Sequence, residues 1–140
     1  MIWQGHKKQK IVTLQDMIEA HHIFKTYDDT RILKDISFSL KAAEIVSIVG
    51  PSGAGKTTLL QILGTLDKPD KNPKTRFTID QTDMLSLSDR ALSTFRNSTL
   101  GFVFQSHQLL PEFSAVENIC MPALIKGVNQ KDANKRALEL

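Results

Sequence analysis

Cysteine and long hydrophobic runs are the features that this sequence most lacks. Its 140 residues include one cysteine, Cys120, which excludes an internal disulfide and is typical of a reducing compartment. No apolar stretch approaches the roughly 20 residues needed to cross a bilayer, and the first residues lack the apolar core of a signal peptide. We therefore expect a cytoplasmic protein whose connection to any membrane runs through a partner.

The sequence also lacks a large excess of either positive or negative charge. The 18 basic and 15 acidic residues leave a net charge of +3, which is too small to indicate a nucleic-acid partner. Part of this excess lies in the run His6-Lys7-Lys8-Gln9-Lys10, which is typical of a solvated tail. With 41% apolar and 24% charged residues, the chain has the composition of one ordinary globular domain.

Hydrophobic periodicity divides the chain into two parts. Residues 1–16 are polar and poorly patterned, which predicts a disordered or loosely attached extension. Beyond it, Ile18–Tyr27 and Ile32–Leu40 predict two strands of an antiparallel hairpin, joined by the turn Asp28-Asp29-Thr30. Apolar and polar residues alternate in the second strand, which indicates that one of its faces is wet.

An α/β unit is predicted after this hairpin. Glu44–Val49 is nearly continuously apolar, as a strand covered on both faces would be. Lys56–Leu66 follows as an amphipathic helix, whose inner face carries Leu59, Ile62, Leu63 and Leu66. Together with the antiparallel hairpin, this unit predicts an α/β fold with a mixed sheet.

The remaining segments have weaker signals. Thr75–Asp80 and Leu100–Phe104 are predicted as short strands, and Asp67–Pro73 as a turn. Three helices are expected: one opened by the capping-box spacing Ser86-Leu87-Ser88-Asp89 and ending near Asn97, one opened by Ser114-Ala115-Val116-Glu117 and ended or kinked by Pro122, and one from Asn129 to Leu140.

The strongest motif is Gly50-Pro51-Ser52-Gly53-Ala54-Gly55-Lys56-Thr57, which matches the phosphate-loop pattern G-x-x-x-x-G-K-[ST]. Its glycines let consecutive N–H groups point inward, and the following helix adds the positive end of its dipole. Lys56 supplies a charge to the β- and γ-phosphates, and the Thr57 hydroxyl is a natural Mg²⁺ ligand. We therefore expect ATP with Mg²⁺, with the phosphates held by Gly50, Ser52, Gly53, Ala54, Gly55, Lys56, Thr57 and Thr58.

Two flanking segments resemble the ATPase domains of ABC transporters. Tyr27, in Phe24-Lys25-Thr26-Tyr27, is similar to the aromatic residue that stacks on adenine in that family. Leu100-Gly101-Phe102-Val103-Phe104-Gln105 resembles the strand and Q-loop, whose glutamine meets the Mg²⁺ and the attacking water and senses the membrane partner. The resemblance therefore implies a P-loop fold in which Lys56 and Gln105 act in catalysis and Thr57 and Gln105 on the metal.

Within that family the chain resembles the LolD-type ATPase subunit of bacterial lipoprotein-releasing systems. The segments that carry this resemblance are Gly64–Pro69, Phe95-Arg96-Asn97, Gln108–Phe113 and Glu117–Gly127. It implies ATP hydrolysis that drives lipoprotein release from the inner membrane, by two ATPase subunits that attach to two membrane subunits.

Related ATPases of macrolide exporters and of cell division share parts of the pattern. The sequence is also compatible with a non-catalytic nucleotide-binding module or with a P-loop kinase, although a kinase would leave Gln105 unexplained.

The chain departs from the family pattern in two ways. Asp70-Lys71-Asn72-Pro73-Lys74 replaces a Gly-containing turn, so the hairpin there is expected to be distorted. Residues 1–140 also lack the signature Leu-Ser-Gly-Gly-Gln, a strand ending in Asp-Glu, and the switch histidine. We therefore expect residues 17–140, with Met17 a candidate start, to be the N-terminal portion of an ATP-binding domain. It would be truncated before the helical subdomain is complete and unable to hydrolyse ATP alone.

Other reactive side chains have simpler explanations. His21, His22 and His107 have no spacing that would make a metal site with Cys120, so they are expected to be structural. Glu117 is interpreted as a helix cap rather than an acid–base catalyst. Glu112 is expected on a partner-facing loop, where Phe113 is a candidate anchor for a membrane subunit.

Overall fold

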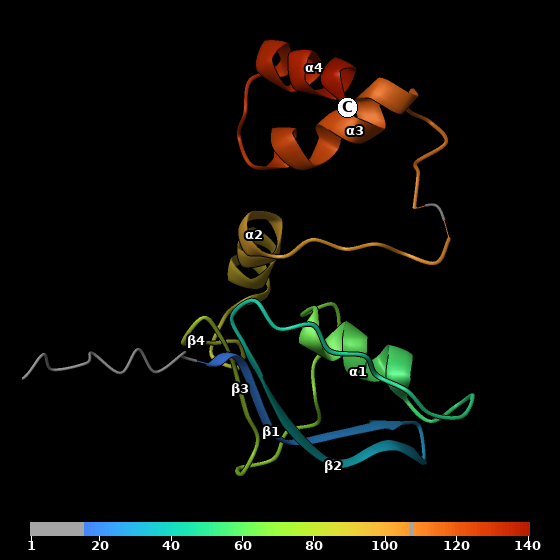
Figure 1. The fold of residues 1–140 in the computed structure, drawn as a ribbon, viewed down its shortest axis with the longest axis vertical. Helices are drawn as coiled ribbons and strands as arrows, with labels where there is room; N and C mark the ends of the chain where they lie inside the picture. The colour runs from blue at the N-terminus through green and yellow to red at the C-terminus, as the bar shows by residue number, and fades with distance from the viewer. Residues whose placement is uncertain (1–15, 107) are drawn as a thin grey trace, which may run out of the picture.

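The computed structural model describes residues 16–106 and 108–140, which form a small sheet and a set of helices (Figure 1). The strands are β1 (Asp16–Tyr27), β2 (Thr30–Lys41), β3 (Arg76–Ile79) and β4 (Thr82–Asp83). The helices are α1 (Lys56–Leu63), α2 (Asp89–Thr99), α3 (Ala115–Ile125) and α4 (Gln130–Glu139). Apart from Asp16, which opens β1, the expected N-terminal extension lies outside the described residues.

The predicted β1–β2 hairpin is confirmed. The two strands pair antiparallel, with Tyr27 opposite Thr30 across a turn in which Asp28 has a φ of 49°. The short strand predicted near Thr75–Asp80 is confirmed as β3, and the sheet has the order β2-β1-β3-β4. Every pairing is antiparallel, so the parallel part of the expected mixed sheet is not formed among the described residues.

Helix α1 packs against the hairpin and supplies much of the core. The buried cluster consists of Ala20, Ile23, Leu33, Ile62, Leu63, Phe77, Ile79, Met84 and Leu92. Ile62 and Leu63 were predicted to face inward and do so, whereas Leu66 remains 47% exposed. The helix ends at Leu63, and Thr65 adopts a left-handed backbone with a φ of 57°. This change of direction turns Leu66 away from the face that the helical period assigned to it.

The strands predicted at Glu44–Val49 and Leu100–Phe104 are wrong for this structure. Neither segment pairs with another strand in the described parts of the chain, and Ile45 is 98% exposed. A strand exists only through hydrogen bonds to a neighbour, which hydrophobicity alone does not provide. The Leu100–Phe104 segment begins a long connection that leads away from α2 toward α3 (Figure 1).

Helix α2 begins later than the capping-box spacing predicts. Its N-cap is Ser88, whose hydroxyl accepts a hydrogen bond from the Ala91 N–H. The Ser86 hydroxyl instead donates to the Asp83 carbonyl, 2.8 Å away, so the turn before the helix already uses it. Leu92 is buried and Phe95 packs against the core, as expected.

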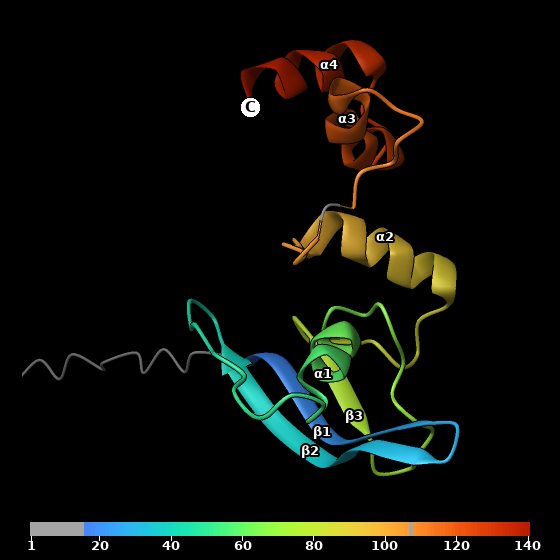
Figure 2. The ribbon, with the colours of Figure 1, turned by 90° about the vertical axis from the view of Figure 1, so that its right-hand side faces the viewer.

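Helices α3 and α4 form a separate helical pair beyond α2 (Figures 1 and 2). The predicted capping box at the start of α3 is confirmed, because Ser114 and Glu117 satisfy each other's backbone N–H groups. Pro122 does not end α3, which continues to Ile125. The Pro122 carbonyl still accepts a hydrogen bond from the Lys126 N–H. No helix in the described part of the chain has the length and apolar character needed to span a bilayer.

Candidate functional site

The predicted phosphate loop and the end of β1 meet at one pocket of about 270 Å³. The residues that line it are Tyr27, Ile32, Ser52, Gly53, Gly55, Lys56, Thr57 and Thr58. Gly50 and Ala54 belong to the same loop without lining the pocket. The structure therefore brings together an aromatic ring and a phosphate-binding motif that lie far apart in the sequence.

Gly55 connects the loop to α1 and lies directly against β2. Its φ of 88° is in the left-handed region, which side chains disfavour. A Cβ at this position would lie 2.9 Å from Leu33 Cδ2 and 3.0 Å from Ile32 Cγ2. Glycine is therefore required here both for the backbone conformation and for the close approach of the loop to the strand.

The N-terminus of α1 faces the pocket with unpaired amides. The first helical bond joins the Leu59 N–H to the Gly55 carbonyl at 2.9 Å, so the amides of residues 56–58 have no partner within the helix. No side chain caps this end, because the N-cap is Gly55. These donors and the helix dipole favour an anion at this position.

Lys56 places a positive charge against the loop. Its Nζ donates to the carbonyls of Gly50, at 2.9 Å, and Pro51, at 2.6 Å, both of which are neutral acceptors. No ion pair within the described ranges includes Lys56, and no acidic side chain lines the pocket. The charge is therefore available to an anionic ligand, as phosphate binding requires.

Tyr27 reaches the pocket from the end of β1 and is anchored on its other side. Its hydroxyl donates to Asp67 Oδ2 at 2.6 Å, while Lys25 donates to Asp67 Oδ1 at 2.7 Å. The hydrogen bond to Asp67, followed by desolvation, raises the pKa of Tyr27 above its ordinary value. The sequence pattern singled out Tyr27 but missed both partners. Lys25 could have been found from its position two residues earlier on the same strand face, whereas no periodicity relates Asp67 to this site.

Gln105 lies outside this pocket. It is exposed and lines a separate groove of about 600 Å³, which Thr57 also borders. The same groove is lined by Leu60 of α1 and by Phe102. The structure thus brings Gln105 and Thr57 to one surface but does not bring Gln105 together with Tyr27.

The turn before β3 is ordered despite its unusual sequence. Asn72 Oδ1 accepts a hydrogen bond from the Lys74 N–H at 2.9 Å, and the Asn72 carbonyl accepts from the Thr75 N–H at 3.0 Å. Strand β3 then pairs with β1 without a register shift. The expected distortion of this hairpin is therefore wrong, because an asparagine side chain closes the turn where a glycine was expected.

The other candidate residues do not assemble into a second chemical site. His22 Nδ1 lies 2.7 Å from Asp35 Oδ1 on the hairpin surface, and His107 lies outside the described residues. Across residues 16–106 and 108–140, no group of three His, Cys, Asp or Glu side chains could hold a metal ion. Glu112 and Phe113 are exposed on the connection that precedes α3.

Comparisons with known proteins agree with this geometry. The family model for ABC transporters matches residues 33–140. The lipoprotein-releasing system ATP-binding protein LolD of Bacteroides thetaiotaomicron is 53% identical over 124 residues, which are 89% of this chain and 56% of that protein. LolD of Cytophaga hutchinsonii is 50% identical over 127 residues, which cover 91% of this chain and 57% of that protein.

Solved structures show the same similarity. A dimeric post-hydrolysis state of the ATP-binding cassette MJ0796, bound to ADP and Pi, is 37% identical and has a TM-score of 0.78, covering 88% of this chain and 55% of that one. The chain thus spans about half the length of the curated relatives that it matches. Because the family model covers most of the chain, and the phosphate loop it implies is formed here, the protein belongs to the ABC transporter family.

Proposed function

We propose that this chain is the ATP-binding part of an ATPase subunit that drives lipoprotein release from the bacterial inner membrane. The observation that carries the proposal is the pocket in which Tyr27 faces the phosphate loop of α1. An aromatic face suits a nucleobase, and the loop amides with Lys56 suit a phosphate chain. The lipoprotein-releasing assignment rests on the similarity to LolD proteins.

Magnesium fits the donors that this site offers. Mg²⁺ is usually held by a few protein oxygens together with nucleotide phosphates and water, rather than by a cage of side chains. The Thr57 hydroxyl lies at the pocket and Gln105 borders the adjoining groove, so these two would contribute protein oxygens. When bound, the ion would neutralise charge that develops on the phosphates.

The partners are proposed from the relatives. A second copy of the chain is one proposed partner, because the ATP-binding cassette MJ0796 is dimeric in its solved structures. Integral-membrane subunits would hold the chain at the cytoplasmic face of the inner membrane. The exposed side chains of Leu109, Leu110 and Phe113 support such a contact on the connection before α3.

One observation favours a second candidate function, a nucleotide-binding unit that does not hydrolyse ATP by itself. The described pocket is lined by no acidic or histidine side chain, so it lacks the groups that most often act as a general base on water. Lys56 and the loop amides would bind the phosphates without positioning the attacking nucleophile.

Calorimetric titration with a nonhydrolysable ATP analogue and Mg²⁺ tests nucleotide binding. Lys56→Ala removes the cation at the loop, and a charge-assisted contact of this kind predicts a loss of roughly one to two decades in affinity. Lys34→Ala, on the exposed face of β2, is the matched control and should bind like the parent chain. Equal affinity in all three proteins would overturn the phosphate-loop assignment.

Phosphate release from the purified chain separates the two candidates. A missing base costs about 10²–10⁴-fold in rate, so the second candidate predicts release near background and no effect of Lys56→Ala. Robust release that disappears in Lys56→Ala would show a complete catalytic site within these residues and would exclude it.

A further inference from the structure

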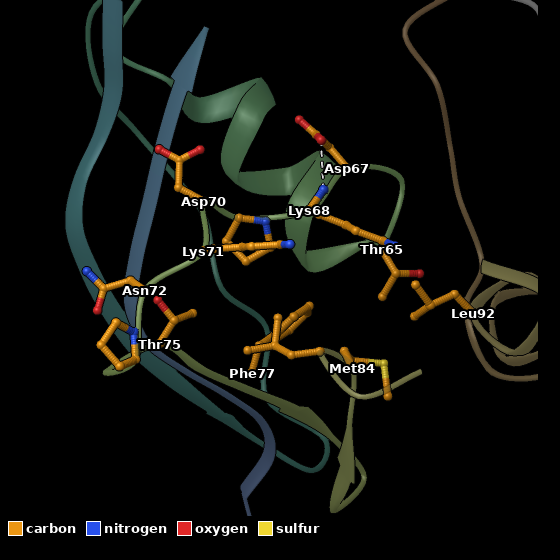
Figure 3. Close-up of a pocket in the computed structure, with 13 residues that line it drawn as sticks. Thr65, Asp67, Lys68, Asp70, Lys71, Asn72, Thr75, Phe77, Met84 and Leu92 are labelled. Carbon is orange, nitrogen blue, oxygen red and sulfur yellow. Dashed lines mark hydrogen bonds between the residues drawn. The ribbon is translucent and has the colours of Figure 1, made fainter. Parts of the chain in front are cut away.

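The Asp67 carboxylate accepts three hydrogen bonds beside the nucleotide pocket. Tyr27 donates to Oδ2 at 2.6 Å, and Lys25 Nζ and the Lys68 N–H each donate to Oδ1 at 2.7 Å. Asp67 also borders a separate cavity of about 470 Å³, but its side chain is directed away from Phe77 and Met84 in that cavity (Figure 3). The carboxylate therefore acts on the β1 side chains rather than on the cavity.

Lys25 completes the arrangement at one face of the ring. Its side chain is only 12% exposed, and its Nζ also donates to the Lys68 carbonyl at 2.7 Å. The same Nζ lies 5.0 Å from the centroid of the Tyr27 ring. One face of the ring is thus covered by a cation that is itself fixed by Asp67, while the residue lines the phosphate-loop pocket.

We propose that Asp67 and Lys25 are positioning residues that hold the Tyr27 ring in place to stack on the nucleobase. The proposal rests on the proposed function and deepens it, because it assigns the orientation of the base platform to two residues outside the phosphate loop. Asp67 fixes the ring at its hydroxyl, and Lys25 occupies the face opposite the one left for the base. Neither residue touches the ligand.

This arrangement has a consequence for specificity. The Tyr27 hydroxyl donates its proton to Asp67, so it cannot also donate to the hydrogen-bonding edge of a base. Recognition is left to the ring face, which accepts any flat base. GTP should therefore compete within about tenfold of ATP, and removing the anchor should weaken both nucleotides alike.

The test compares a nonhydrolysable ATP analogue with inorganic tripolyphosphate, which has the phosphates but no base. Tyr27→Phe keeps the ring and removes its anchor. Asp67→Asn removes the charged acceptor. Each variant should bind the ATP analogue about two- to tenfold more weakly, the effect of freeing one side chain, and tripolyphosphate as the parent does. Asp29→Asn, in the exposed hairpin turn, is the matched control and should change neither affinity.

The losses from the two single changes should also not add fully, because both changes weaken the same contact between Tyr27 and Asp67. The double variant Tyr27→Phe with Asp67→Asn should lose less affinity for the ATP analogue than the two single losses combined predict. Unchanged ATP affinity in Tyr27→Phe, or an equal loss of tripolyphosphate, would overturn the proposal. Lys56→Ala, which should weaken both ligands, separates this result from a failure of the phosphate loop itself.

A spectroscopic measurement reports the anchor without any ligand. Tyr27 is the only tyrosine in the chain, so the ultraviolet absorbance of tyrosinate follows this residue alone. Its raised pKa should fall toward the ordinary value in Asp67→Asn and stay raised in Asp29→Asn. A Tyr27 titration that is identical in Asp67→Asn and the parent would show that the anchor does not form.

Discussion

At the scale of single residues, Gly55 shows how a binding motif also serves packing. The phosphate-loop pattern explains a glycine here by the close approach of phosphates, and the structure adds a second reason, the close approach of β2. Leu33 and Ile32 of β2 lie where a side chain would be placed. The motif predicted a glycine at position 55 and a phosphate ligand. It could not predict the contact with β2 that leaves no room for a side chain at this position, because β2 lies outside the motif.

Gly55→Ala and Gly53→Ala form a matched pair that separates these two reasons. Both positions have a positive φ, so each substitution should cost about 1–2 kcal/mol of backbone strain. Only Gly55→Ala meets β2, and overpacking should cost about 1–3 kcal/mol more. Urea unfolding measures the difference. Equal losses of stability in the two variants would contradict the close packing of the loop on Leu33.

Asp67 should make stability depend on pH in the acid range. Burial raises the pKa of this carboxyl, but hydrogen bonds from Lys25, Tyr27 and the Lys68 N–H outweigh burial and bring it below its ordinary value of 3.8. The side chain is 28% exposed, which moderates the effect.

The lowered pKa of Asp67 determines the direction in which stability changes with pH. Since the folded pKa lies below the unfolded one, the contribution is fully present above the ordinary value and is lost as pH falls through the folded pKa. The urea midpoint should therefore fall less steeply on acidification in Asp67→Asn than in the parent chain. A parallel fall in both proteins would contradict the anchoring role of this carboxylate.

At the scale of elements, the sequence predicted those whose partners lie nearby in the chain. The β1–β2 hairpin carries its own pairing, and α3 and α4 begin at caps formed by Ser114 and Asn129. Glu44–Val49 has the composition of a buried strand, yet its pairing depends on distant segments that local pattern does not reveal. The apolar composition of this segment predicts a buried strand, but a strand forms only where a neighbouring segment supplies hydrogen-bond partners.

Native-state hydrogen exchange tests this difference between elements. Amides in the central part of β1 pair with β2 or β3 and should exchange slowly, because their opening requires the sheet to separate. Amides of residues 45–49 have no strand partner among residues 16–106 and 108–140 and should exchange near the rate of an open chain. Strong protection of residues 45–49 in the isolated chain would show a strand pairing that this structure lacks.

At the scale of the whole molecule, the candidate site depends on a contact between the hairpin and the loop before α1. The motif alone identified Lys56 and Thr57, and the family resemblance identified Tyr27. Only the fold brings these residues into one pocket and adds Asp67 behind the ring. Gln105 lines a separate groove from Tyr27, and the strand predicted before it does not form among the described residues.

Hydrogen exchange of the chain with and without a nonhydrolysable ATP analogue and Mg²⁺ tests whether the nucleotide binds at the phosphate loop, because it locates the bound ligand. We expect slower exchange of the backbone N–H groups within residues 50–58, which would donate to phosphates, and no comparable change across residues 67–75. The separate cavity of about 470 Å³ lies along that second segment (Figure 3). Slower exchange centred on residues 67–75, with residues 50–58 unchanged, would place the nucleotide elsewhere and contradict the account.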